Sequence, residues 1–180
     1  IEHGSESGYD PYWGVVNCNN SSPTISNSHF LNCSADGIYM KESQSEIKDN
    51  LFNSISSKAI ALNSSMATIS GNTLNNGGGN TSIYLGSDCS STQITNNIID
   101  GGGSYGIYAE SSTYLTISQN QITNKNDDGI YLESCSDATI NSNTITNNGE
   151  RGIYLENYNN NATINSNTIS GNTSYGITLN

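Results

Sequence analysis

The residues best placed to do chemistry are three acids, Asp127, Asp128 and Glu150. Paired carboxylates with separated pKa values divide the roles of general acid and general base in glycoside hydrolysis. Asp127 and Asp128 are adjacent, and Glu150 follows Asp127 by 23 residues. The two histidines, His3 and His29, lie far from these acids, near the N-terminus. The three acids are therefore weak candidates for catalysis, and a solvated turn is the simpler interpretation.

A row of tyrosines and glutamates forms a second candidate site. The tyrosines recur at nearly constant spacing, with Ala61 in the place of one of them, and glutamate follows two residues after each of the last three. Three like charges on neighbouring strands, roughly 5 Å apart, repel unless they are screened, protonated or bridged by a cation. The candidate ligand or partner face comprises Tyr84, Tyr108, Tyr131, Tyr154, Glu110, Glu133 and Glu156.

Several interpretations of this face stay open. Flat rings beside carboxylates suit sugar binding, because the rings stack on pyranose faces and the acids accept hydrogen bonds from hydroxyls. Glu110, Glu133 and Glu156 would alternatively bind calcium, and no other metal or cofactor is expected. The face would otherwise contact a partner or a second subunit. In the simplest interpretation, the tyrosines stack on one another and the glutamates stay solvated.

An internal repeat organises the elements that must position these residues. A phrase reading GIYL or a variant of it recurs, and a second phrase, ATINSNTI or a variant, lies between its copies. Alternation within GIYL directs Ile and Leu to one face and Tyr to the other, which is the period of a strand and not of a helix. The central aliphatic residues, 22 to 24 residues apart, are Val15, Ile38, Ile60, Ile83, Ile107, Ile130, Ile153 and Ile177.

Stacked coils of such strands predict a ladder of asparagines. Asparagine recurs three residues after the first aliphatic residue of the second phrase, except in the first copy, which has Ser28. Its amide can donate to the next coil and accept from the previous one, and asparagine tolerates the left-handed backbone of a tight turn. The predicted structural ladder comprises Asn50, Asn72, Asn97, Asn120, Asn143 and Asn167.

The GIYL and ATINSNTI phrases resemble the right-handed parallel β-helix repeat of pectin-lyase-like and NosD-like proteins, alginate epimerases and many archaeal surface proteins. The resemblance implies an all-β fold, a single right-handed parallel β-helix of about eight coils with an internal asparagine ladder. It covers residues 13–180, and residues 1–12 are expected to form an N-terminal lead or cap. Enzymes of this architecture use acidic clusters with Arg, Lys or His beside a polysaccharide groove, but their Arg-centred lyase motif and their Gly-His-Gly motif are absent here.

Charged residues two positions before the central aliphatic residue fit this register. Asp36 is expected beside Lys58 on the next coil, and Asp128 beside Arg151. Arg151 is in turn expected beside Tyr175. Opposite charges on adjacent strands attract, so these residues form surface ion pairs in this interpretation.

Charge and composition limit the classes of molecule that this protein could bind. The net charge of -11 disfavours nucleic acid, which requires a cationic surface, and leaves calcium, basic proteins and neutral or amine-bearing sugars open. No stretch is apolar enough to span a membrane. Among four cysteines, Cys18 and Cys33 are the one pair expected to form a disulfide. Asn-X-Ser/Thr triplets, which favour an extracellular address, begin at Asn19, Asn20, Asn32, Asn63, Asn80, Asn161 and Asn172.

These observations favour a non-catalytic structural β-solenoid of the cell surface. The chain stops after a strand, without a capping helix, so end-to-end or side-to-side self-association into a filament, sheath or surface layer is expected. The alternative is a carbohydrate-binding or polysaccharide-modifying β-helix module of the lyase, epimerase or hydrolase type. The tyrosine and glutamate rows favour this alternative.

Overall fold

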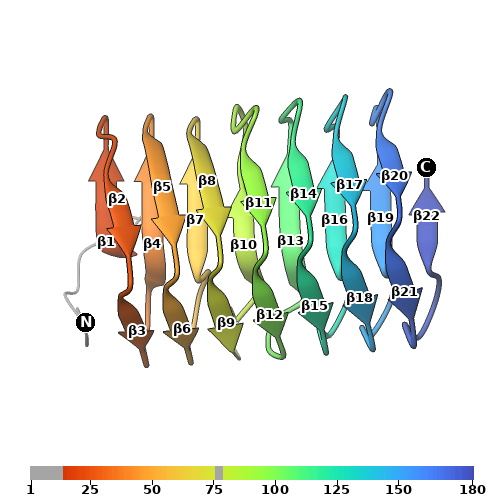
Figure 1. Cartoon of the computed structure of the whole chain (residues 1–180), viewed down its shortest axis with the longest axis horizontal. Coiled ribbons are helices and arrows are strands. Elements are labelled where there is room, and N and C mark those ends of the chain that lie inside the picture. The colour runs from red at the N-terminus through yellow and green to blue at the C-terminus, as the bar shows by residue number, and fades with distance from the viewer. Residues whose placement is uncertain (1–13, 76–78) are drawn as a thin grey trace.

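The chain winds into coils, and each complete coil contributes one strand to each of three parallel sheets. The computed structural model describes residues 14–75 and 79–180 (Figure 1). These residues form seven complete coils and one strand of an eighth, and they contain no helix. The expected all-β parallel solenoid is therefore confirmed. His3 and the lead or cap expected at residues 1–12 lie outside the described residues.

The strands of each sheet are hydrogen-bonded in coil order, and all pairs are parallel. Sheet I comprises β1 (Gly14–Asn19), β4 (Asp36–Lys41), β7 (Ile60–Asn63), β10 (Thr81–Leu85), β13 (Tyr105–Glu110), β16 (Ile130–Glu133), β19 (Ile153–Glu156) and β22 (Ile177–Leu179). Sheet II comprises β2 (Thr24–Ser26), β5 (Gln44–Lys48), β8 (Met66–Ser70), β11 (Gln93–Thr95), β14 (Thr116–Ser118), β17 (Thr139–Asn141) and β20 (Thr163–Asn165). Sheet III comprises β3 (His29–Leu31), β6 (Leu51–Asn53), β9 (Thr73–Asn75), β12 (Ile98–Asp100), β15 (Gln121–Thr123), β18 (Thr144–Thr146) and β21 (Thr168–Ser170).

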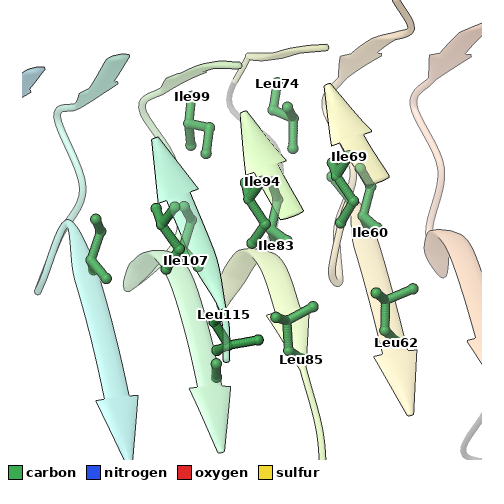
Figure 2. Packing of buried hydrophobic residues seen from close by; sticks show 14 of the residues in the cluster. Ile60, Leu62, Ile69, Leu74, Ile83, Leu85, Ile94, Ile99, Ile107 and Leu115 are labelled. Atoms are coloured by element: carbon green, nitrogen blue, oxygen red, sulfur yellow. The ribbon is translucent and has the colours of Figure 1, made fainter. Parts of the chain in front are cut away.

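The core consists of rows of aliphatic side chains that run along the axis. Ile60, Ile83 and Ile107 are direct partners on successive strands of sheet I, and all three are fully buried. Figure 2 shows these residues beside the inward-facing isoleucines of sheet II. The first coil departs from the expected register by one residue, because Val16 and not Val15 pairs with Ile38. Each coil thus depends on its neighbours to bury its apolar residues.

The asparagine ladder lies in the turn between sheets II and III. Each ladder amide donates to the Oδ1 of the next, as in the bond of 3.0 Å from Asn72 Nδ2 to Asn97 Oδ1. The same Oδ1 accepts the main-chain N–H of Asn72 at 2.9 Å, and Asn97 Nδ2 also donates to the carbonyl of Ile69. Equivalent bonds link Asn50, Asn72, Asn97, Asn120, Asn143 and Asn167.

The left-handed backbone is adopted by the residue before each ladder asparagine and not by the asparagine itself. Asn96 (φ 57°), Gln119 (φ 58°) and Ser142 (φ 54°) are examples, and Gly71 (φ 65°) precedes Asn72. The expectation that the ladder asparagines themselves adopt this conformation is wrong. In each turn, the residue with positive φ therefore reverses the chain, and the asparagine that follows it fills the interior.

The turn between sheets I and II carries a column of small polar side chains. Ser65 Oγ accepts the main-chain N–H of Ser43 at 3.1 Å, and Ser112 Oγ accepts that of Cys89 at 2.9 Å. Cys89 and Cys135 occupy this column, where burial raises the pKa of each thiol to about 11. All four cysteines are free thiols, so the disulfide expected between Cys18 and Cys33 does not form.

A second amide column lies where sheet III turns back to sheet I. Asn148 Nδ2 donates to Asn172 Oδ1 at 2.9 Å, and a Cβ on Gly129 would lie 2.9 Å from that same Nδ2. Lys125 starts the column in place of an asparagine, and its buried ammonium donates to Ser82 Oγ at 2.9 Å and to the Gly101 carbonyl at 2.8 Å. Burial lowers the pKa of Lys125 to about 8.

We predict that Asn97→Ala destabilises the protein far more than Asn165→Ala. Loss of Asn97 leaves the main-chain N–H of Asn72 without its acceptor inside the turn. It also removes one acceptor of the Asn72 side-chain amide, which still donates to the carbonyls of Ile47 and Ser70. The unpaired buried N–H costs about 1–3 kcal/mol and the lost side-chain bond adds to it, so we expect a loss of about 3 kcal/mol in the free energy of unfolding. Asn165 is exposed on β20, and its substitution should change that free energy by less than about 0.5 kcal/mol. Urea denaturation measures both, and equal midpoints would contradict a ladder that stabilises the fold.

Candidate functional site

A groove of about 410 Å³ opens on the outer face of sheet I, over strands β4, β7, β10 and β13. It exists because the tyrosine row is interrupted: Tyr39, Ala61, Tyr84 and Tyr108 are successive partners across these four strands. The missing ring at Ala61 leaves space between the tyrosines on either side. The lining residues are Asp36, Tyr39, Lys58, Ala61, Asn63, Asn80, Thr81, Tyr84, Tyr108 and Glu110.

Charged groups of both signs line this groove. Asp36 is 7% exposed, and its Oδ1 accepts the main-chain N–H of Lys58 at 2.9 Å. The Lys58 ammonium lies over the Tyr84 ring, 5.1 Å from its centroid, where the negative ring face attracts a cation. Asp36 and Lys58 are neighbours, as predicted, but the ion pair expected between their side chains does not form, because the ammonium lies over Tyr84. The groove combines carboxylates, an amine and aromatic surface.

Beyond the groove, the tyrosine rings pack face to face along the axis. Tyr108 and Tyr131 have centroids 4.8 Å apart with planes 9° apart, and Tyr131 and Tyr154 are 5.1 Å and 9° apart. Tyr84 instead meets Tyr108 edge-on, at 5.6 Å and 66°. Tyr105, which the sequence did not single out for this face, lies 5.5 Å from Tyr108. Stacked rings cover each other's faces, so the flat aromatic surface is at the groove end of the row.

Three tyrosine hydroxyls of the row, those of Tyr84, Tyr108 and Tyr131, donate to the glutamate of the next coil. Tyr108 donates to Glu133 at 2.9 Å, and short bonds join Tyr84 to Glu110 and Tyr131 to Glu156. Hydrogen bonds from phenols to ionised carboxylates are strong, and they stabilise glutamates that would otherwise repel one another. Burial, followed by the hydrogen bond to Glu133, raises the pKa of Tyr108 well above its ordinary value. The glutamate row is therefore bonded to the tyrosine row, which the simplest interpretation of solvated glutamates did not include.

Arg151 brings two of the three candidate catalytic acids together. Its Nε lies 3.2 Å from Asp128 Oδ1, and its terminal nitrogen lies 2.6 Å from Glu150 Oε2. Burial raises the pKa of Asp128, which is 3% exposed, while Arg151 opposes that rise. The expected pair of Asp128 and Arg151 is confirmed, but the ring beside the guanidinium is Tyr154, 3.8 Å away, and not Tyr175.

Asp127 is half-buried, and its main chain joins the coils on either side of it: its N–H donates to Ser104 and its carbonyl accepts from Glu150. Two of the candidate acids are thus partners of one guanidinium and the third lies in a hydrogen-bonded turn, an arrangement suited to an ion-pair network. The assignment of these acids to catalysis stays a weak prediction.

Comparison with known proteins decides the family. The right-handed β-helix region matches residues 13–92 and residues 78–180, which together span nearly the whole chain. The chain belongs to the right-handed β-helix family. A search of curated proteins found no match. One solved structure that it resembles is the A-module of mannuronan C-5 epimerase AlgE4 from Azotobacter vinelandii, with 13% identity and a TM-score of 0.39. The match covers 83% of this chain and 63% of that module.

Membership of the β-helix family establishes the fold and leaves the site to be argued from its own residues. Among the residues that the structure describes, no group of three His, Cys, Asp or Glu side chains is arranged to hold a metal ion. Calcium at Glu110, Glu133 and Glu156 stays a prediction. In the same described part of the chain, no helix is long and apolar enough to cross a membrane.

The potential glycosylation triplets of this β-helix differ in their surroundings. Asn172 is half-buried and belongs to the second amide column, where its Oδ1 accepts two bonds from Asn148. Asn63 is half-buried at the groove, and Asn161 is exposed but donates to Asp137. Asn19, Asn20, Asn32 and Asn80 are exposed.

We predict that Glu133→Gln lowers the pKa of Tyr108 while leaving it above 10. Burial, the larger cause of the raised pKa, persists in the variant, whereas the negative acceptor is lost. Because the folded pKa is raised, Tyr108 stabilises the fold below pH 10, and that contribution disappears as the pH rises through the folded pKa. Phenolate absorbance during a pH titration, with circular dichroism to monitor folding, measures the change. Asp137→Asn removes the same charge away from the row, and a phenolate titration curve like that of Glu133→Gln would contradict the assignment.

Proposed function

We propose that this protein is a non-catalytic, carbohydrate-binding β-helix whose binding site is the groove at Ala61. The observation that carries the proposal is the gap in the tyrosine row, bordered by Tyr39, Tyr84 and Tyr108. Sugar sites combine apolar ring surface with a few polar groups that fix orientation. Asp36, Glu110, Asn63 and Asn80 supply acceptors and donors around the gap.

The charge of the protein supports a neutral or amine-bearing glycan as the ligand. The chain carries -11 overall, and the groove holds two carboxylates against one ammonium. An anionic polysaccharide would be repelled by this field, whereas a cationic group is attracted to it. An extracellular or cell-surface location, as the glycosylation triplets suggest, would give the groove access to such glycans.

The non-catalytic part of the proposal rests on the state of the acids. In the groove, Asp36 accepts a main-chain N–H, and Glu110 accepts the hydroxyl of Tyr84. Outside it, Asp128 and Glu150 neutralise Arg151. A general acid must hold a proton that it can transfer to the leaving group, whereas these carboxylates accept hydrogen bonds or pair with a guanidinium.

We predict that Ala61→Tyr reduces oligosaccharide affinity at least about tenfold, a loss of about 1.4 kcal/mol. The new ring would restore the repeat and fill the groove without removing any of its walls. Binding of chito-oligosaccharides and cello-oligosaccharides, measured by calorimetry on unglycosylated protein, tests this. Thr178→Tyr is the matched control, because Thr178 is the partner of Tyr154 at the far end of the same row. Undiminished binding by Ala61→Tyr, or no binding by the unmodified protein, would remove the proposal.

The second candidate is a structural solenoid of the cell surface that self-associates. It is favoured by the tyrosine and glutamate rows, whose hydroxyls and carboxylates bond to each other across the coils. Such internal pairing makes this face of the rod rigid. A rigid face is suited to packing against a second copy of the chain. We predict fibres or sheets in electron micrographs of concentrated protein if this candidate holds. Uniformly separate particles at every concentration, with or without calcium, count against it.

A further inference from the structure

Two of the glycosylation triplets open onto the same groove. Asn63 and Asn80 both line it, together with Tyr84 and Glu110. Asn63 follows the last aliphatic residue of β7, and Asn80 immediately precedes β10. The other five triplets do not contribute their asparagine to this lining. The groove thus has an attachment point for a sugar chain on each of two adjacent coils.

Surroundings distinguish Asn80 from Asn63 as the attachment point. Asn63 is half-buried, whereas Asn80 is exposed at the rim. The residue at the third position of the Asn80 triplet is Ser82, which is fully buried against Lys125 and fixes the start of β10. Asn80 therefore immediately precedes a firmly held strand, and it is exposed. A group attached to its amide is free to extend over the neighbouring surface.

We propose that Asn80 is an N-glycosylation site and that its attached glycan lies in the groove as a tethered ligand. The inference rests on the proposed function, because it assigns the regulation of the same site. Attachment requires a lipid diphosphate-linked oligosaccharide as donor. The Asn80 Nδ2 forms a bond to sugar C1, the bond from C1 to the diphosphate oxygen breaks, and the amide gives up one proton. The lipid diphosphate is the leaving group.

Tethering makes the attached glycan a strong competitor for the groove. Tyr84 lies four residues after Asn80, about 13 Å along an extended strand, which is within reach of the first few sugars. A ligand on a short flexible linker has an effective concentration in the millimolar range. Free oligosaccharides of ordinary affinity would be excluded at lower concentrations. The glycosylated protein therefore keeps its groove occupied, and only protein unmodified at Asn80 binds external sugar.

The test uses full-length chain secreted from a eukaryotic host that performs N-glycosylation. Wild type, Asn80→Gln and Asn161→Gln are compared, the last being a matched triplet outside the groove lining, and wild type from a host without N-glycosylation provides the intact groove for the binding of free sugar. Peptide mass spectrometry measures occupancy at each site. Reductive methylation then reports access to Lys58, which lines the groove, with the exposed Lys41 as an internal standard. Calorimetry with chito-oligosaccharides measures binding of free sugar.

We expect Asn80 to be occupied and Lys58 to be methylated at least threefold more slowly in wild type and Asn161→Gln than in Asn80→Gln, with Lys41 unchanged. Free sugar should bind to unglycosylated wild type, which keeps Asn80 in the groove lining, and not to glycosylated wild type. An unmodified Asn80, or equal methylation of Lys58 in all three proteins, overturns the inference. Methylation does not require free sugar to bind, so protected Lys58 together with no sugar binding by unglycosylated wild type would uphold the placement of the glycan and reject the proposed function.

Discussion

Every coil of this protein depends on the coils beside it for both its hydrogen bonds and its buried surface. One coil cannot bury its own isoleucines, but stacked coils align them, as Ile60, Ile83 and Ile107 are aligned. The asparagine ladder fixes the same register in the turns, because each Oδ1 accepts both an amide and a main-chain N–H of the preceding coil. A shift of one residue would break both sets of contacts together.

Alignment of like residues stabilises apolar rows and creates a problem for charged ones. Isoleucine on isoleucine buries surface, whereas Glu110, Glu133 and Glu156 on adjacent strands repel. The repulsion between these glutamates is offset because the tyrosine side chain is long enough to donate a hydrogen bond to the glutamate of the next coil. The stacked rings and their hydroxyl bonds then form one connected row. The tyrosines and glutamates that suggested a binding face therefore use most of their ring faces and polar groups in contacts with one another.

The sequence was sufficient to predict the coils, the ladder and the ion pair of Asp128 with Arg151, because each follows from a spacing of about one coil. It was insufficient where the outcome depends on side-chain direction. Arg151 contacts Tyr154 in place of the expected Tyr175, and Tyr105 joins the aromatic row from a different column. The interruption at Ala61 was visible in the sequence, but its effect depends on rings of Tyr39 and Tyr84 that do not close over it. A repeat predicts where residues lie, whereas rotamers determine what lies open.

Departures from the repeat are consequently the places where this fold acquires individual properties. Ala61 in place of tyrosine removes a ring from an otherwise continuous row and leaves a groove. Ser82 in place of glycine is accompanied by Lys125 in place of an amide, and the two bond to each other inside the rod. Both exceptions lie at or beside β10, which Asn80 immediately precedes. The open groove, its proposed attachment point and the buried contact that holds the strand therefore meet at this strand. A regular solenoid offers the same surface at every coil, and a specific ligand requires a coil that differs.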